Sequence, residues 1–261
     1  GDDADGHDTI DGGAGANTLD FTVDFDDVNG FVGEDDLIDT FDGDWVIGLV
    51  DGDTAISNIQ TVRLDSIFTD GGTIALDASL IGGLQTVIVR NDDGDDDADF
   101  LIHDMEAGVL VQVQHASDDD KSEDIDATYV LLHHADGTGA DDLQTVEIIS
   151  GTNTAEEFNF TLDIDANDAD DADVFDEEVE NVTIIDSDTE NNTVELVMAD
   201  EHDGTLTLTG GRANDTFTID DDDQIIAETV DASGQLSDVT IDLGEADQTV
   251  TMGSGDDNVV F

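Results

Sequence analysis

Glycine and acidic residues recur at a fixed spacing near both ends of the chain. Residues 12–20 read Gly-Gly-Ala-Gly-Ala-Asn-Thr-Leu-Asp, and residues 252–260 read Met-Gly-Ser-Gly-Asp-Asp-Asn-Val-Val. Glycine tolerates positive φ angles, so such a segment can form a tight turn in which backbone carbonyl oxygens converge. Asp or Asn at the sixth position adds a side-chain oxygen, and Ca²⁺ prefers hard oxygen ligands. The spacing therefore predicts calcium-binding turns, each followed by a short strand with an inward-pointing apolar residue.

Further copies of the pattern lie beside or between these two segments. Residues 3–11 and residues 243–251 directly precede them in the same nine-residue register, the second as a decayed copy. Another copy, at residues 210–218, has Ala213 where the third glycine is expected. Two in-register pairs at opposite ends are a stronger signal than one Gly- and Asp-rich segment. The candidate turn glycines and metal ligands are Gly6, Asp8, Gly13, Gly15, Asn17, Gly211, Asp215, Gly253, Gly255 and Asp257.

The repeated segment resembles the RTX nonapeptide of calcium-binding β-rolls, Gly-Gly-x-Gly-x-Asp-x-apolar-x. The broader resemblance is to type I-secreted bacterial surface-layer proteins and giant adhesins. In that family two nonapeptides make one coil, and each ion lies between the turns of successive coils. The resemblance implies that residues 3–20 and 243–260 each form one coil with half of each ion site. It also implies Ca²⁺ as the cofactor and an extracellular or cell-surface location reached by type I secretion.

The charge balance of the chain requires an external source of cations. Asp and Glu together number 70 and Lys and Arg only 4, which gives a formal net charge of −66. A compact body with this charge repels itself unless divalent ions or concentrated salt neutralise it. Nucleic acids and anionic membranes are poor partners, since both bind through positive charge on the protein. The chain has no cysteine, so disulfides and thiolate metal sites are excluded.

Short apolar runs separated by turn residues predict an all-β protein. Apolar residues make up 38% of the chain, proline is absent and glycine is frequent, with 26 residues. Such strands with regular turns are typical of sandwiches, barrels and solenoids. Disorder without calcium is the alternative that the high charge leaves open. Helix evidence is limited to residues 100–111, which could hold a turn or two.

A recurring hexamer favours the solenoid among these architectures. It has an apolar residue, Gln, Glu or Ser, a small polar residue, Val, any residue and a final apolar residue. The copies begin at Ile59, Leu84, Leu143, Val179 and Leu236, with starts 25, 59, 36 and 57 residues apart. Equivalent strands along a chain are what stacked solenoid coils require, although chance recurrence in a Thr-, Val- and Asp-rich chain remains the alternative. The predicted fold is an irregular parallel β-solenoid with RTX-like coils at both ends. Its expected divisions are residues 1–23, 24–200 and 201–261.

Catalytic signatures are missing from the sequence. The six histidines form no His-x-x-x-His pair for zinc, and the adjacent His133 and His134 would face opposite sides of a strand. No nucleophile elbow, phosphate-binding loop or dinucleotide fingerprint occurs. A β-helical glycosidase or lyase needs no local motif, but one Trp and one Tyr leave little for a sugar platform. We therefore expect a protein that is not an enzyme.

The expected function is that of an extracellular, calcium-dependent structural protein. It would assemble with other copies of itself into a surface layer or filament through end-to-end or lateral contacts, with cell-surface polysaccharide as a further partner. Because the chain begins with Gly1, we expect it to be processed or cut from a longer polypeptide. One alternative is a spacer module of a large secreted adhesin. The other is a halophilic surface protein that is acidic for solubility in concentrated salt.

Overall fold

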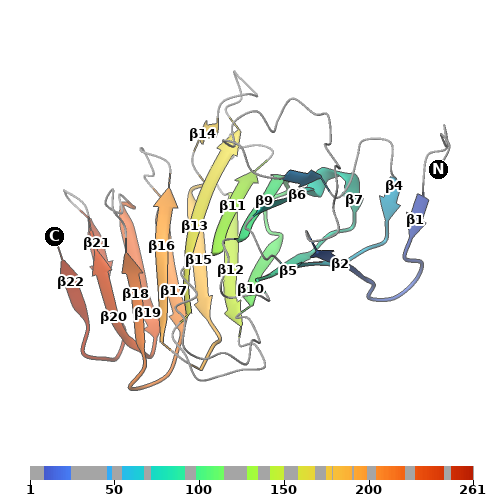
Figure 1. Cartoon of the computed structure of the whole chain (residues 1–261). Helices are drawn as coiled ribbons and strands as arrows, with labels where there is room; N and C mark the ends of the chain where they lie inside the picture. The colour runs from blue at the N-terminus through green and yellow to red at the C-terminus, as the bar shows by residue number, and fades with distance from the viewer. Residues whose placement is uncertain are drawn as a thin grey trace.

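The chain is an all-β, parallel β-solenoid, as the sequence predicts (Figure 1). This is a computed structural model. It describes residues 9–24, 46–48, 55–67, 72–91, 98–114, 128–134, 142–149, 158–167, 175–177, 179–189, 191–198, 204–220, 227–243 and 248–260. Each coil contributes one strand to each of two long parallel sheets, so the strands lie side by side along the stack. Among the described residues, no helical segment has the length and apolar character that a membrane-spanning helix requires.

The first sheet has nine described strands and the second has ten. In stacking order the first contains β2 (Thr18–Asp24), β5 (Thr61–Ile67), β8 (Thr86–Asn91), β10 (Leu110–Gln114), β12 (Leu143–Ile149), β15 (Asn181–Asp186), β17 (Thr205–Gly210), β19 (Thr229–Gln235) and β21 (Thr249–Thr251). The second contains β3 (Val46–Gly48), β6 (Gly72–Asp77), β9 (Ala98–Met105), β11 (Thr128–His134), β13 (Phe158–Asn167), β16 (Asn192–Met198), β18 (Thr216–Asp220), β20 (Asp238–Asp242) and β22 (Asn258–Val260), with β14 (Phe175–Glu177) antiparallel to β13.

The N-terminal coils also contribute strands to a small third sheet. It consists of β1 (Thr9–Asp11), β4 (Ala55–Ser57) and β7 (Ile81–Gly82). A single 3₁₀ turn among the described residues, η3 (Ala78–Leu80), connects β6 to β7.

Alternation of apolar and polar residues along each strand places one set of side chains inside the roll. In β15 the buried residues alternate with half-exposed ones from Asn181 to Asp186. Parallel pairing in register then stacks equivalent residues of successive coils. One such ladder is completely buried and consists of Val62, Val87, Val111, Val146, Ile184 and Leu208. The ladder makes the core a continuous column along the solenoid. Burying each side chain of this size stabilises the fold by about 1.5–3 kcal/mol.

The recurring hexamer marks equivalent coils, with one exception. Four copies overlap the starts of β5, β8, β12 and β15 of the first sheet, and an unrecognised coil containing β10 explains the long interval after Leu84. The copy that begins at Leu236 instead enters β20 of the second sheet. Only Leu236 and Ser237 separate β19 from β20, so the chain changes sheets within the hexamer.

The prediction of helical turns within residues 100–111 is wrong. Residues 98–105 form β9, which pairs in parallel with β6 and β11. Phe100 and Ile102 point into the core and are fully buried, which a strand with a period of two achieves. Gly108, with a φ of +85°, then turns the chain into β10.

Candidate functional site

Four turns lie near the C-terminal end of the stack, and two of them carry the predicted Gly211, Asp215, Gly253, Gly255 and Asp257. The four turns connect β15 to β16, β17 to β18, β19 to β20 and β21 to β22, and we call them the turn column. Backbone hydrogen bonds hold successive turns together: Gly211 N donates to Asp186 O at 2.7 Å, and Leu236 N donates to Gly210 O at 2.9 Å. Ser254 N donates to Gln235 O at 3.3 Å. The turns are therefore stacked like the strands that they join.

The last coil shows the spacing that two nonapeptides require. β22 pairs with β20, and Asp257 Oδ1 accepts a hydrogen bond from Val239 N, 18 residues earlier, at 3.1 Å. A Cβ on Gly253 would lie 2.2 Å from Gln235 O, and one on Gly255 would lie 2.8 Å from Ser237 O. Only glycine permits these close approaches. The structure thus brings the predicted Gly253 and Gly255 against carbonyl oxygens of the preceding coil, and the predicted Asp257 against the Val239 N–H of that coil.

Gly211 and Asp215 lie beside a group of buried polar side chains that sequence reasoning missed. This group, which we call the buried polar cluster, consists of Asp186, Asp188, Asn192, Gln235 and Ser237. Asp186 and Asp188 are each only 4% exposed. A Cβ on Gly211 would lie 2.0 Å from Ser237 Oγ and 3.1 Å from Asp186 Oδ2, so the glycine leaves room for the cluster.

Hydrogen bonds inside the cluster converge on one carboxylate. Asp186 Oδ1 accepts from Asp188 N at 3.2 Å and from Asn192 Nδ2 at 3.0 Å. Gln235 Nε2 lies 3.4 Å from both Asp186 Oδ2 and Ser237 Oγ. Gln235 Oε1 is buried without a hydrogen-bond partner, although a buried polar atom normally has one. An oxygen of this kind beside carboxylates is a suitable ligand for a hard cation.

The electrostatics of the cluster also favour a cation. Burial raises the pKa of Asp186 to about 6, and repulsion from the Asp188 and Asp215 carboxylates adds to this, while hydrogen bonds from Asp188 N and Gln235 oppose it. A buried carboxylate is costly unless it is paired or coordinates a metal. The two buried carboxylates and the amide and hydroxyl oxygens of Gln235 and Ser237 are hard oxygen atoms of the kind that Ca²⁺ prefers.

The N-terminal turn is built differently. Gly13 and Gly15 have positive φ angles of 73° and 129°, as expected for a tight turn. Asn17 Nδ2, however, donates to Gly13 O at 3.4 Å, Gly15 O at 3.4 Å and Asn58 O at 2.9 Å. An amide nitrogen thus lies among three carbonyl oxygens of the kind that would ligate an ion. The other predicted ligands at this end, Gly6 and Asp8, lie outside the described residues.

Replacing Asn17 with Asp is expected to convert this turn into a calcium site. Without calcium, the variant loses the three donated hydrogen bonds and places a carboxylate among carbonyl oxygens, so local stability should fall by about 1–3 kcal/mol. With calcium, the variant should bind one additional ion, because the carboxylate supplies the missing anionic ligand. Hydrogen exchange of residues 9–20 measures the first effect, and calorimetric calcium stoichiometry measures the second. A stoichiometry equal to that of the wild type would contradict this account of the turn.

The sequence contains little that would have revealed the buried polar cluster. Its members belong to two different turns, and Asp186 and Asp188 lie in a segment, Asp-Ser-Asp-Thr-Glu-Asn-Asn, that does not match the nonapeptide. The weak signal was an Asp-x-Asp pair directly after an alternating strand. Which coils lie next to that pair depends on the lengths of the intervening loops.

Comparison with protein-family models, curated proteins and solved structures finds no match to this chain.

Proposed function

We propose that the chain is a calcium-dependent structural protein of the extracellular surface, which assembles end to end with further copies of the same solenoid. The observation that carries this proposal is the state of the two end coils. Val250 and Val259 are only partly buried, although the residues on which they stack, Val230 and Ile241, are 0% exposed. At the other end, Leu19 and Phe21 are likewise partly buried above the fully buried Val62 and Leu64.

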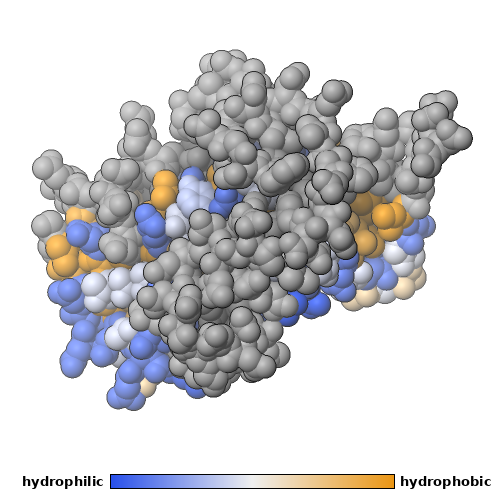
Figure 2. Space-filling model, viewed as in Figure 1, coloured by the Kyte–Doolittle hydropathy of each residue, from blue (hydrophilic) through white to orange (hydrophobic). Residues whose placement is uncertain are grey.

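Both ends therefore present inward-pointing hydrophobic residues that one more coil would cover. Figure 2 shows hydrophobic surface at the two ends of the stack. A parallel solenoid has different surfaces at its two ends, so a contact between them is head to tail and does not close. The resulting assembly is a filament, or a lattice if lateral contacts join the filaments. Tandem copies in one long chain would use the same contact, which is the adhesin-spacer alternative.

Calcium is the cation that this proposal assigns to the turns. The net charge of −66 opposes compaction, and the buried polar cluster holds carboxylates that need a counter-ion. Extracellular modules commonly bind calcium with Kd values of about 10⁻⁴–10⁻³ M. At tenfold excess over Kd each independent site adds about 1.4 kcal/mol, so several sites could supply much of a typical folding free energy of about 5–15 kcal/mol.

Replacing Val259 with Asp is expected to abolish assembly. The charged side chain would lie on the inward face of the end coil, where a stacked copy would bury it without a partner. Sedimentation and electron microscopy in millimolar calcium should show filaments for the wild type and single chains for the variant. Circular dichroism in calcium checks that the variant keeps its β structure.

The matched control for this experiment is Val260→Asp, which introduces the same charge on the same strand. Val260 alternates with Val259 and is exposed, so this variant should still assemble. A wild-type chain that stays monomeric in millimolar calcium would favour the adhesin-spacer alternative. Equal loss of assembly in both variants would argue against contact through the inward face.

A further inference from the structure

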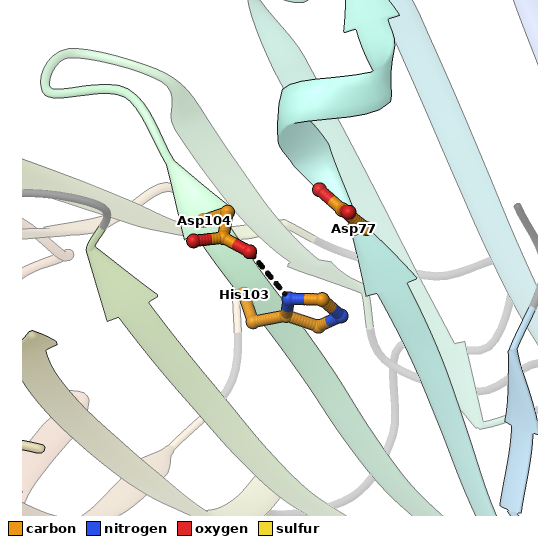
Figure 3. A group of neighbouring side chains, drawn as sticks. All are labelled: Asp77, His103 and Asp104. Carbon is orange, nitrogen blue, oxygen red and sulfur yellow. Dashed lines mark hydrogen bonds and ion pairs between the residues drawn. The ribbon is translucent and has the colours of Figure 1, made fainter. Parts of the chain in front are cut away.

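A second group of potential metal ligands lies on the outer surface of the second sheet, far from the turn column in the chain. β6 and β9 pair in parallel, and their register places Asp77 opposite His103. Asp104 follows His103 directly. One potential ligand atom from each of these three residues lies within 4.8 Å of the other two. In Figure 3 the two carboxylates lie on the same side of the imidazole.

A β-bulge creates this arrangement. Leu132 of β11 pairs with Ile102 of β9, but His134 pairs with Met105, so His133 alone lies opposite two residues. Ile102 and Met105 are both buried, and between them His103 and Asp104 are both partly exposed. In a regular strand the side chains of two consecutive residues point to opposite faces. The extra residue, with Asp104 at a φ of +52°, lets both side chains reach the same surface.

The side chains of the group are oriented by hydrogen bonds that leave ligand positions available. Asp77 Oδ1 accepts hydrogen bonds from Ser79 N at 2.9 Å and Ser79 Oγ at 2.6 Å, at the start of η3. These bonds make Asp77 the N-cap residue of η3, and its second carboxylate oxygen takes no part in the cap. His103 Nδ1 lies 3.0 Å from Asp104 Oδ2. All three residues are half-buried, so an ion can reach them from solvent while the neighbouring strands restrict their rotamers.

We propose that Asp77, His103 and Asp104 bind a divalent transition-metal ion of the zinc class. The imidazole nitrogen indicates which class of metal ion binds, because imidazole suits Zn²⁺, Cu²⁺ and Ni²⁺, whereas Ca²⁺ and Mg²⁺ select oxygen ligands. Two carboxylates and one neutral imidazole carry two negative charges, which a dication neutralises. Ligand atoms around tetrahedral zinc lie about 3.3 Å apart, as follows from bond lengths of about 2.0–2.1 Å. Small side-chain rotations would therefore close the observed group around an ion.

This site is separate from the proposed calcium turns and extends the proposed function. An ion held there would link β6 to β9, two successive coils of the second sheet. Three protein ligands also leave a fourth position of a tetrahedral ion for water or another small ligand. His103 belongs to no zinc motif in the sequence, and it lies beside a second carboxylate because the bulge brings Asp104 to the same surface.

Titration with ZnCl2 by isothermal calorimetry tests the proposal. The protein is the full chain without added tag histidines, kept in saturating calcium so that oxygen-only sites are filled. The wild type should bind one zinc ion with a saturable isotherm. The His103→Gln variant should bind it at least about tenfold more weakly, which corresponds to about 1.4 kcal/mol. Glu106→Gln, which removes an exposed carboxylate just beyond β9, should bind zinc within about twofold of the wild type.

A second variant keeps the proposal testable if His103→Gln disturbs the fold. Asp77→Asn retains a side-chain acceptor for the cap of η3 but loses the charge, and it should also weaken zinc binding at least about tenfold. X-ray absorption of the zinc-loaded wild type should show an imidazole ligand. Equal zinc affinity in the wild type and both variants, or zinc bound through oxygen alone, would overturn the proposal. Neither result would bear on the calcium response, which is measured separately.

Discussion

Replacing Asp186 with Asn is expected to stabilise the calcium-free protein at pH 7 by about 3 kcal/mol. Burial raises the pKa of Asp186 from 3.8 to about 6, and one pKa unit corresponds to about 1.4 kcal/mol. Asparagine has nearly the same shape and keeps an acceptor for Asn192 Nδ2, but it carries no charge to desolvate. In calcium the order should reverse, because the variant has lost an anionic ligand of the proposed site. The variant should therefore gain less stability from calcium than the wild type does.

The same pKa shift predicts a pH dependence with a definite sign. The folded-state pKa of Asp186 lies above its ordinary value of 3.8, so protonation favours the folded state. The stability contributed by the protonated group is fully present below pH 3.8 and is lost as the pH rises through about 6. In EDTA the free energy of unfolding of the wild type should thus rise, relative to that of Asp186→Asn, as the pH falls from 7 to 5.

Urea unfolding at pH 7 and pH 5, in EDTA and in millimolar calcium, measures these effects. Glu228→Gln is the matched control, since it removes one unit of charge at an exposed position and should change stability by less than about 0.5 kcal/mol. If Asp186→Asn and the wild type gain equal stability from calcium, Asp186 is not a ligand. The buried polar cluster would then be a hydrogen-bonded element of the core.

The second large effect is expected from Gly210→Ala, which should destabilise the C-terminal coils by about 3 kcal/mol or more. Gly210 has a φ of +103°, and a Cβ there would lie 2.1 Å from Asp186 O. The added methyl group would push apart two coils that the Gly211 N to Asp186 O hydrogen bond holds together. Overpacking costs about 1–3 kcal/mol, and a left-handed backbone costs an L-residue a further 1–2 kcal/mol or so.

Gly13→Ala separates these two contributions. Gly13 also has a positive φ, of +73°, but a Cβ there would have no atom within 4 Å. In this control the free energy of unfolding should fall only by the cost of a left-handed backbone at an L-residue, about 1–2 kcal/mol. Native-state hydrogen exchange is the appropriate measurement, because a solenoid can lose a few coils without unfolding as a whole. Equal destabilisation in the two variants would show that contact between the coils at Gly210 is not tight.

The fold could be predicted from the sequence because a solenoid repeats one local rule. Short alternating strands, frequent glycine and the hexamers at Ile59, Leu84 and Leu143 all express the same pattern of buried and exposed residues. The coil containing β10 escaped detection because Val109, Val111 and Val113 keep the apolar pattern without the Gln-Thr pair. Apolar periodicity therefore defines a coil more reliably than the polar residues of the hexamer.

The sites were less predictable, because they depend on which coils are neighbours. Asp257 and Val239 meet at a fixed 18-residue offset, so the last turn could be derived from the repeat alone. Asp186 and Gln235 are 49 residues apart and belong to turns of different lengths. The group around His103 depends on one inserted residue that shifts the register of β9. Insertions of this kind change which side chains meet without changing the apolar pattern.

A calcium titration from EDTA at fixed ionic strength, followed by circular dichroism and light scattering together, tests the central claim most directly. The account predicts a cooperative gain of β signal as calcium rises into the millimolar range, accompanied by growing particle size. Magnesium or sodium at the same ionic strength should not reproduce the transition. Full β structure in EDTA, unchanged by calcium and strengthened only by concentrated salt, would contradict the account and support the halophilic alternative.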